Sequence, residues 1–303
     1  MGSLIVPLLQ AIARQNPAQE KFLEQSLAAL DQEGAAELEA YLGYSLGSGL
    51  DLETLARAYC IVVLDTLKEQ IYFRRHGRYR HARFADVAEA VYYSAEYMPT
   101  YMRGLALTTY LWPNHKRIKR FFSENIPRNS GGTYLEIGPG HGLFFMTAMR
   151  LAAFDRHLGI DISPTSVEMT RGILNSGHFG TFRNFSVILS DFLQWQGAEQ
   201  ATAVVMGEVL EHVEQPELFL GRVARVAAPG AFIFVTTCLN APAVDHIYLY
   251  ESLEQIHAQV ARAGLSVATE LCLPYVGLSL EQCMAERLPV NVALVLSKDS
   301  GDC

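Results

Sequence analysis

The sequence predicts an α/β fold, in which a doubly wound, mostly parallel sheet follows a region made only of helices. From Thr133 onward short apolar strands alternate with helices, which is typical of a parallel sheet covered on both faces. Residues 3 to about 125 instead show apolar residues near helical spacing. Turn-forming residues 127–132 separate the two patterns. We therefore predict an all-α N-terminal lid over residues 1–126 and a second domain over residues 127–303.

The lid is predicted to contain several helices whose ends the sequence marks. Asp51 can cap a long helix, and Gly77 can end it. Pro99 is expected to stop the next helix, because proline has no N–H to donate. The limits that we predict are Asp51–Gly77, Phe84–Met98, a stretch that ends at Trp112, and Asn114–Phe122.

The second domain is predicted to alternate strands and helices along its length. Ser163 can cap a helix that has Pro164 at its first position, where the missing N–H costs nothing. Ser252 and Gln255 are predicted to form a capping box for a helix that ends at Gly264. The predicted strands are Thr133–Ile137, Leu158–Ile162, Val187–Ser190, Ala203–Met206, Ala231–Thr236, Ser266–Leu271 and Val290–Leu296.

The charge of the chain limits its partners. The 303 residues carry 24 Lys and Arg against 32 Asp and Glu, a net charge of −8. The excess lies in the second domain, because residues 131–303 have 9 basic and 18 acidic side chains and residues 1–130 have 15 and 14. Phosphate contacts need clustered Lys and Arg, so we expect no nucleic-acid partner.

Cysteine usage and hydropathy favour a cytoplasmic location. The five cysteines are an odd number without a C-x-x-C pair, which favours a reducing compartment, and we predict no metal site. The N-terminus lacks the pattern of a signal peptide. The longest uncharged run, 227–244, contains prolines and polar residues that a membrane helix would hardly use. We therefore expect no membrane partner.

The most informative segment is the glycine-rich turn Tyr134-Leu-Glu-Ile-Gly-Pro-Gly-His-Gly142, where a strand runs through glycines into a helix. Glycines there permit a tight turn and let a ligand approach the main chain closely. A nicotinamide-binding turn looks similar, and glycine turns also serve packing alone. The turn by itself therefore leaves the ligand open.

Acidic residues follow the next strands of the predicted sheet. Asp161 ends the second strand, 21 residues after Gly140, where a carboxylate can accept both hydroxyls of a ribose. Asp191 ends the third strand and can accept from an adenine amine, while the adjacent Phe192 can cover the ring face. Residues 207–212 end the fourth strand. All these positions lie at the carboxyl ends of parallel strands, where open sheets bind ligands.

Taken together, these segments resemble a known family. LEIGPGHG, GIDIS, SDF, GEVLEHVEQP and AAPGAFIFVTT, in this order, resemble the core motifs of class I S-adenosylmethionine-dependent methyltransferases. Within that family the chain is most similar to the ubiquinone- and menaquinone-biosynthesis enzymes and many natural-product methyltransferases. The resemblance covers roughly residues 130–298. It implies a Rossmann-like sheet of seven strands whose last strand, Val290–Leu296, is antiparallel. It also implies S-adenosyl-L-methionine as cofactor and S-adenosyl-L-homocysteine as product.

The resemblance further implies which residues hold the cofactor. The nicotinamide alternative weakens, because its fingerprint is G-x-G-x-x-G whereas this turn is G-x-G-x-G. By position, the resemblance assigns the methionine part to Glu136, Gly138, Pro139, Gly140 and Gly142, the ribose to Asp161, the adenine to Ile162, Asp191 and Phe192, and the sulfonium side to Gly207 and Glu208.

Methyl transfer from a sulfonium is an in-line displacement, for which a protein supplies proximity, alignment and a dry site. A general base is needed only if the acceptor must lose a proton. His246, after the fifth strand, is the first candidate for a catalytic residue, and His212, after the fourth strand, is the second. A structural role stays open for each of them. His141, inside the glycine turn, is expected to be a packing residue.

We expect the acceptor pocket to be built partly by the lid, which is rich in aromatic residues. Tyr93, Tyr97 and Tyr101 lie four residues apart, on one helical face unless Pro99 breaks it, and are the candidate substrate residues. Most other tyrosines of the lid are expected to lie on half-buried helix faces. The basic run Arg74–Arg83 is a solvated face, a clamp for an acceptor carboxylate or phosphate, or an ion-pair partner of the acidic helices before it.

The sequence thus predicts an enzyme that transfers a methyl group from S-adenosyl-L-methionine to a small-molecule acceptor, such as a secondary metabolite or biosynthetic intermediate. The acceptor atom stays open among oxygen, nitrogen and carbon. Two alternatives remain: a methyltransferase for protein or RNA, and a protein that binds the cofactor without methylating. A homodimer formed through the helical part also stays open.

Overall fold

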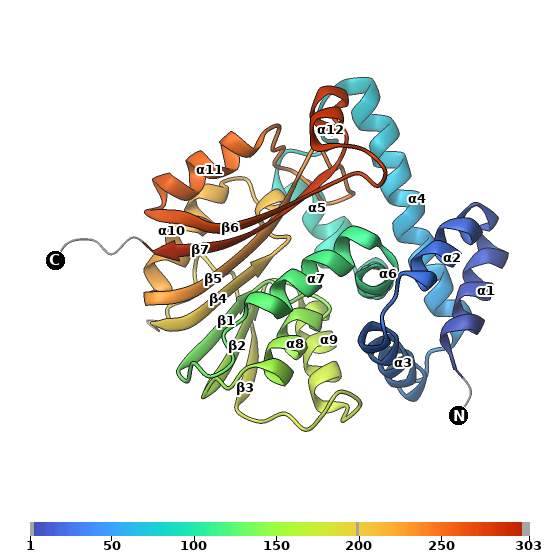
Figure 1. The fold of residues 1–303 in the computed structure, drawn as a ribbon, viewed down its shortest axis with the longest axis horizontal. Coiled ribbons are helices and arrows are strands. Elements are labelled where there is room, and N and C mark those ends of the chain that lie inside the picture. The colour runs from blue at the N-terminus through green and yellow to red at the C-terminus, as the bar shows by residue number, and fades with distance from the viewer. Residues whose placement is uncertain (1–2, 198–199, 299–303) are drawn as a thin grey trace.

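The computed structural model describes residues 3–197 and 200–298. Seven strands form a sheet in the order β3-β2-β1-β4-β5-β7-β6, with helices on both faces (Figure 1). Strands β1 to β5 pair in parallel, and β7 pairs antiparallel with β5 and β6. The doubly wound sheet with an antiparallel last strand is therefore confirmed. The strands are β1 (Thr133–Ile137), β2 (Arg156–Asp161), β3 (Phe185–Leu189), β4 (Ala201–Gly207), β5 (Ala227–Leu239), β6 (Leu265–Pro274) and β7 (Val290–Lys298).

The central strands are buried on both faces. Residues 203–206 of β4 are apolar and buried without interruption, as expected for a parallel strand covered by helices on either side. One apolar cluster joins the sheet to α8 (Leu143–Leu151) and α9 (Pro164–Asn175). A second cluster joins it to α10 (Pro216–Val226) and α11 (Leu253–Arg262).

Helices α1 to α7 precede the sheet and make up the lid. The first apolar cluster runs without a break from lid residues such as Leu42 and Tyr59 to Phe234 of β5, so lid and sheet share a core. The elements change type between Asn125 and Thr133, and the exact domain boundary stays a prediction. The helices are α1 (Ile5–Gln15), α2 (Glu20–Ala28), α3 (Gln32–Gly47), α4 (Leu52–His76), α5 (Phe84–Val87), α6 (Tyr97–Leu111) and α7 (Pro113–Asn125).

Two predicted helices have the ends that the sequence marks. The Asp51 carboxylate accepts the Thr54 N–H at 2.7 Å at the start of α4, and Gly77 ends this helix in the left-handed conformation (φ 67°). At the start of α9 the Ser163 hydroxyl accepts a main-chain N–H, and Pro164 occupies the first helical position. Both predictions are confirmed.

The helix predicted over residues 84–98 is wrong. Helix α5 ends at Val87, a π-helical turn covers Ala88–Tyr92, and α6 begins at Tyr97 and runs through Pro99. Proline is tolerated there because the N–H groups of the first turn have no helical acceptor. Tyr93 therefore lies outside the helix that carries Tyr97 and Tyr101, so the three tyrosines do not share one helical face.

Two predicted caps are also wrong. Helix α7 starts at Pro113, so Asn114 lies inside the first turn, where its amide donates to the main-chain oxygens of β6. Ser252 makes no capping hydrogen bond, and Gln255 instead accepts the N–H of Glu251 at 2.7 Å. A capping box instead lies at the start of α12 (Leu280–Glu286), a helix that was not predicted from the sequence.

Within the lid, α4 and α6 cross closely at Gly104. A Cβ atom at Gly104 would lie 2.4 Å from the Ala58 oxygen and 2.5 Å from the Val62 side chain, so only glycine fits. This crossing fixes the position of α6 over the sheet. Across the described residues, we find no helix that is both long and apolar enough to cross a membrane.

Candidate active site

A cavity of about 1040 Å³ lies at the carboxyl ends of β1 to β5, and residues of α4, α6 and α7 line its other side. Ligand pockets commonly measure about 300–1,000 Å³, so this cavity has room for a cofactor together with a second molecule. Of the predicted cofactor residues, ten line the cavity: Glu136, Gly138, Pro139, Gly140, Asp161, Ile162, Asp191, Phe192, Gly207 and Glu208.

The glycine turn after β1 adopts a conformation that favours glycine. Gly138 and Gly140 have φ angles of 66° and 56°, in the left-handed region. A Cβ at Gly140 would lie 2.8 Å from the Cε of Met102 in α6, so the turn and the lid are in contact. Gly142 lies instead at the start of α8, where a Cβ would be 3.0 Å from the Thr170 Cα of α9. The structure thus gives Gly142 a packing position outside the cavity wall.

Two buried carboxyl groups stand beside this turn. Asp161 accepts the N–H groups of Gly140 at 3.0 Å and Ser163 at 2.9 Å, and burial raises its pKa to about 6. Burial also raises the pKa of Glu136 to about 8, and this carboxyl accepts a hydrogen bond from the Tyr134 hydroxyl. Carboxyl groups held in such surroundings fit a ligand that carries positive charge, as the sulfonium and ammonium groups of S-adenosylmethionine do.

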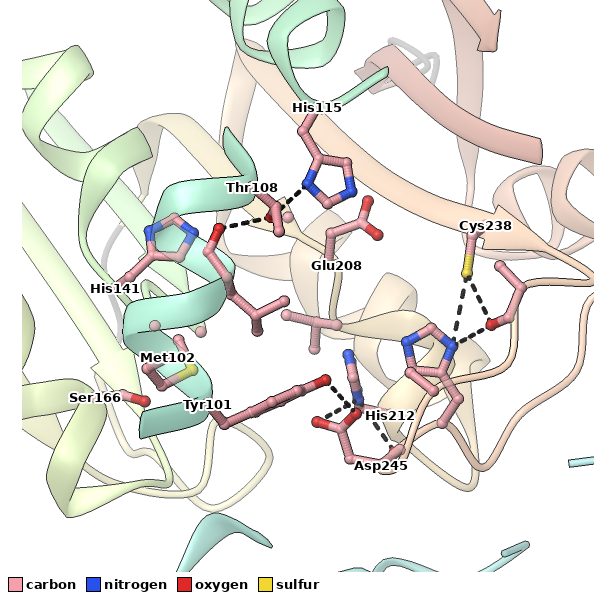
Figure 2. A pocket seen from close by; sticks show the side chains of 18 of the residues that line it. Tyr101, Met102, Thr108, His115, His141, Ser166, Glu208, His212, Cys238 and Asp245 are labelled. Atoms are coloured by element: carbon pink, nitrogen blue, oxygen red, sulfur yellow. Dashed lines mark hydrogen bonds and ion pairs between the residues drawn. The ribbon is translucent and has the colours of Figure 1, made fainter. Parts of the chain in front are cut away.

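The ends of β3 and β4 complete the cofactor side. Asp191 accepts the N–H of Leu193 at 2.8 Å, and the buried ring of Phe192 lies beside it in the cavity wall. Glu208 has a left-handed φ of 50°. Its N–H donates to the Thr236 hydroxyl at 2.9 Å, and that hydroxyl donates to the Glu208 carboxylate at 2.6 Å. Figure 2 shows the Glu208 side chain pointing into the cavity.

Two further histidines line the cofactor side. His141 accepts the Leu143 N–H at its Nδ1, so its proton lies on Nε2, and burial lowers its pKa to about 4. His141, expected to be a packing residue, lines the cavity. His115 of α7 was not predicted. Its Nδ1 donates to the Thr108 hydroxyl at 2.9 Å, since that hydroxyl donates its own proton to the Leu105 oxygen (Figure 2).

His212 lies between two buried carboxyl groups. Its Nδ1 is 3.1 Å from the main-chain oxygen of Asp245 and 3.4 Å from the Asp245 carboxylate, so the proton of the neutral ring lies on Nδ1. Its Nε2 is 3.9 Å from Glu211, whose facing oxygen is buried without a hydrogen-bond partner. Burial and the neighbouring Glu208 raise the pKa of Glu211 well above its usual value.

His246 has different surroundings. Its Nδ1 donates to the Ala241 oxygen at 2.6 Å, and its ring stands perpendicular to that of His212 with centroids 4.7 Å apart. Burial, and then the nearby His212, lower the pKa of His246 to about 3. His246 is therefore neutral throughout the physiological pH range and takes up a proton with difficulty.

Of the three predicted substrate residues, Tyr101 alone lines the cavity. Its hydroxyl donates to Asp245 at 3.1 Å. Tyr97 donates to Asp65 at 2.7 Å, and Tyr93 is 44 % exposed. Tyr92, which was not predicted, lines the cavity and donates to Asp245 at 3.2 Å. The π-helical turn explains this change, because it moves Tyr92 rather than Tyr93 to the inner side.

The described residues include two groups with the residue types of a metal site: Glu211, Cys238 and His246, and His212, Asp245 and His246. Most of their atoms already have partners within the protein. The Nδ1 atoms of both histidines bond to main-chain oxygens, and Glu211 accepts the Thr237 hydroxyl at 2.7 Å. We therefore keep the prediction that the site works without a metal ion.

No residue of the basic run 74–83 is part of the cavity wall, although Tyr79 packs behind it against His246. Arg80 pairs with the buried Glu69 at 3.0 Å, and Arg83 pairs with Asp86 at 2.7 Å. Arg80 also stacks over Tyr72. These contacts favour the ion-pair role for part of the run over a clamp for the acceptor.

The fold and the site can now be compared with known proteins. A family model described as a methyltransferase domain matches residues 96–287, more than half of the chain. The chain belongs to the class I S-adenosylmethionine-dependent methyltransferases. The family, the enzyme class and the cofactor that the sequence predicts are confirmed. The match begins within the lid, at the start of α6.

Relatives with assigned names are matched over part of their length. The ubiquinone biosynthesis O-methyltransferase of Brucella anthropi is 27 % identical over 171 residues, which are 50 % of this chain and 67 % of that protein. Other enzymes with this name, among them those of Xanthomonas axonopodis and Cupriavidus pinatubonensis, are matched over less than half of their length. The chain thus spans about two-thirds or less of the length of these curated relatives.

Solved structures share the fold at low sequence identity. The mitomycin 7-O-methyltransferase MmcR is 14 % identical with a TM-score of 0.55, over 82 % of this chain and 70 % of that one. Haemonchus contortus phosphoethanolamine N-methyltransferase 2, solved with S-adenosyl-L-methionine, is 13 % identical with a TM-score of 0.52, over 72 % and 60 %. At this identity both comparisons show the fold alone.

Proposed function

We propose that this methyltransferase acts on a small-molecule acceptor bound in the same cavity as the cofactor. The observation that carries the proposal is the continuity of the cavity, which joins the strand ends Glu136, Asp161 and Asp191 to Tyr92 and Tyr101 of the lid. The lid covers the site closely, since Met102 lies against the glycine turn. A cavity that the lid covers on one side suits a small acceptor better than a protein or RNA chain.

The names of the similar proteins support this substrate class. The Brucella anthropi relative is a ubiquinone biosynthesis O-methyltransferase, and MmcR is a mitomycin 7-O-methyltransferase. Both names refer to small organic acceptors that are methylated on oxygen. We therefore favour a secondary metabolite or biosynthetic intermediate with a hydroxyl group as the acceptor.

A hydroxyl acceptor loses its proton during the reaction, and we assign His212 as the base. When bound, S-adenosylmethionine would supply an activated methyl carbon for attack by the acceptor oxygen, and S-adenosylhomocysteine would be the leaving group that takes the electron pair of the broken C–S bond. The acceptor proton passes to the Nε2 of His212. The Asp245 oxygens at Nδ1 stabilise the imidazolium that forms. His246, the first candidate from the sequence, becomes the second because burial lowers its pKa to about 3.

Three related predictions stay open to experiment. The free cysteines Cys60, Cys238, Cys272 and Cys283 support a reducing, cytoplasmic location. A homodimer through the helical part predicts that the intact protein sediments with the molar mass of a dimer, and a monomer would exclude it. Glu136, Asp161 and Asp191 are proposed to hold the methionine, ribose and adenine parts of the cofactor.

The proposed function is tested with methyl-labelled S-adenosylmethionine, the purified protein and a metabolite extract of the source cells, separated by size. We expect label in the small-molecule fraction, and mass analysis then identifies the acceptor. Label in protein or RNA would instead support a macromolecular acceptor. Cofactor binding without any transfer, over extracts from several growth conditions, would support the alternative that the protein binds the cofactor without methylating.

A further inference from the structure

We propose that Tyr92 and Tyr101 are positioning residues of the lid, which hold Asp245 and through it the ring of His212. The reacting base is then completed only when the lid lies over the catalytic domain. The inference rests on the proposed function for the role of His212 as the base, and its first test below does not depend on that role.

Asp245 receives its hydrogen bonds from both parts of the molecule. The Tyr101 hydroxyl donates to one carboxylate oxygen at 3.1 Å and the Tyr92 hydroxyl to the other at 3.2 Å. The Nδ1 of His212 lies 3.4 Å from the oxygen that Tyr92 also contacts. Asp245 itself is 3 % exposed, so water offers few replacements for these donors.

The two tyrosines are suited to act as fixed donors. Burial, and then the charge of Asp245, raise the pKa of each hydroxyl well above its usual value, so both keep their protons. Each hydroxyl therefore acts as a donor toward Asp245. Two donors on different oxygens leave the carboxylate little freedom to rotate.

Two oxygens of Asp245 together set which nitrogen of His212 is available. The Asp245 main-chain oxygen and carboxylate both lie at Nδ1, which places the proton there and leaves Nε2 free to accept one. Figure 2 shows Tyr101, Asp245 and His212 in contact, with the second nitrogen of His212 directed away from Asp245. Without the tyrosine hydroxyls, we expect the carboxylate to turn, so that the main-chain oxygen alone holds the proton at Nδ1 and the second tautomer becomes more populated.

Both tyrosines are also attached to the cofactor side of the site. The main-chain oxygen of Tyr92 accepts the Ser163 hydroxyl at 3.2 Å, at the end of β2. Tyr101 precedes Met102, whose side chain lies against Gly140. The lid segment that holds Asp245 thus also contacts the glycine turn and the start of α9.

The chain offers a matched control in Tyr97. It belongs to the same helix as Tyr101, and their rings stack with centroids 5.4 Å apart. Its hydroxyl donates to Asp65 instead of Asp245. Removal of the Tyr97 hydroxyl thus perturbs the packing of α6 to a similar degree and leaves the donors of Asp245 in place.

The first test uses nitrogen-15 NMR of labelled histidine in the protein saturated with S-adenosylhomocysteine, with His212→Gln to assign the signal. We expect a single tautomer with the proton on Nδ1 in the parent protein and in Tyr97→Phe. The double variant Tyr92→Phe/Tyr101→Phe should show averaged shifts of the two tautomers. Unchanged shifts in the double variant would overturn the inference, as would the same change in Tyr97→Phe.

The second test measures turnover of the acceptor found by the labelling experiment. Each single variant, Tyr92→Phe or Tyr101→Phe, should lower kcat about tenfold and keep KM for S-adenosylmethionine within about twofold, as expected for a group that acts through the base. Equal losses of kcat in Tyr97→Phe would overturn the inference. A changed tautomer with unchanged kcat would leave the positioning role intact and remove His212 as the base, so the two proposals fail separately.

Discussion

The catalytic domain and the lid build the same cavity by different means. In the catalytic domain the cavity residues follow consecutive parallel strands, so their places are set by the topology of the sheet. In the lid they come from helices whose contacts depend on where each helix begins and how it crosses its neighbour. Site residues at strand ends can therefore be predicted from the sequence, whereas site residues on packed helices are identified only from the three-dimensional structure.

The largest effect is expected where the two regions meet, at His212. Replacement by alanine should lower kcat by about 10²–10⁴-fold, the usual contribution of a general base, while the dissociation constant of S-adenosylhomocysteine stays within about twofold. His246→Ala should lower kcat less than about tenfold, because burial lowers the pKa of His246 to about 3. Steady-state kinetics and calorimetry of the two variants decide between them. A larger loss in His246→Ala would reverse the assignment.

The next effect concerns the cofactor alone and sharpens the contrast with the lid. Asp161→Ala removes the acceptor of the Gly140 and Ser163 N–H groups, so it should weaken cofactor binding by about 1.5–3 kcal/mol. Titration calorimetry with S-adenosylhomocysteine measures this change. An unchanged affinity would mean that Asp161 neither binds the ribose nor holds the glycine turn.

A stability pair compares a glycine of the lid with one of the catalytic domain. Gly104→Ala should lower the free energy of unfolding by about 1–3 kcal/mol, because its Cβ would overlap the main chain of α4. Gly221, in α10, has open space around the corresponding position, and Gly221→Ala should raise stability by about 0.5–1 kcal/mol. Urea unfolding of both variants tests the pair. Equal effects would show that the α4–α6 crossing is less tight than described.

The last prediction is a pH dependence of the stability of the protein without cofactor. Burial raises the pKa of Glu136 from about 4.5 to about 8, so the folded state keeps a proton that the unfolded chain has lost. The contribution of Glu136 to the free energy of unfolding is fully present below pH 4.5. It is lost as the pH rises toward 8, at no more than about 1.4 kcal/mol per pH unit. Thermal unfolding against pH should show a weaker fall in Glu136→Gln. A parallel fall in the variant would contradict the assignment to Glu136.

The sheet and the cofactor side of the cavity followed from the sequence because both depend on local patterns. The strand before the glycine turn and the acidic residue after β2 could be placed from strand–helix alternation alone. Gly142 was expected in the cavity wall and lies against α9 instead, because the turn uses its third glycine to start α8. That distinction depends on packing, which spacing does not show.

The lid was harder to predict for a physical reason. The π-helical turn at Ala88–Tyr92 shifts the helical phase, so the spacing that grouped Tyr93 with Tyr101 had no structural meaning. Tyr92 and His115 enter the cavity only because α4, α6 and α7 pack across the sheet. No sequence pattern in these lid segments indicates that packing.

We propose that the catalytic domain holds the cofactor and that the lid completes the base. The most direct test measures S-adenosylhomocysteine binding and methyl transfer together in Asp161→Ala and in Tyr92→Phe/Tyr101→Phe. We predict opposite losses: Asp161→Ala loses affinity and, at saturating cofactor, keeps kcat within about threefold, whereas the tyrosine variant keeps affinity and loses kcat. Loss of the same quantity in both variants would contradict the division of work between the two regions.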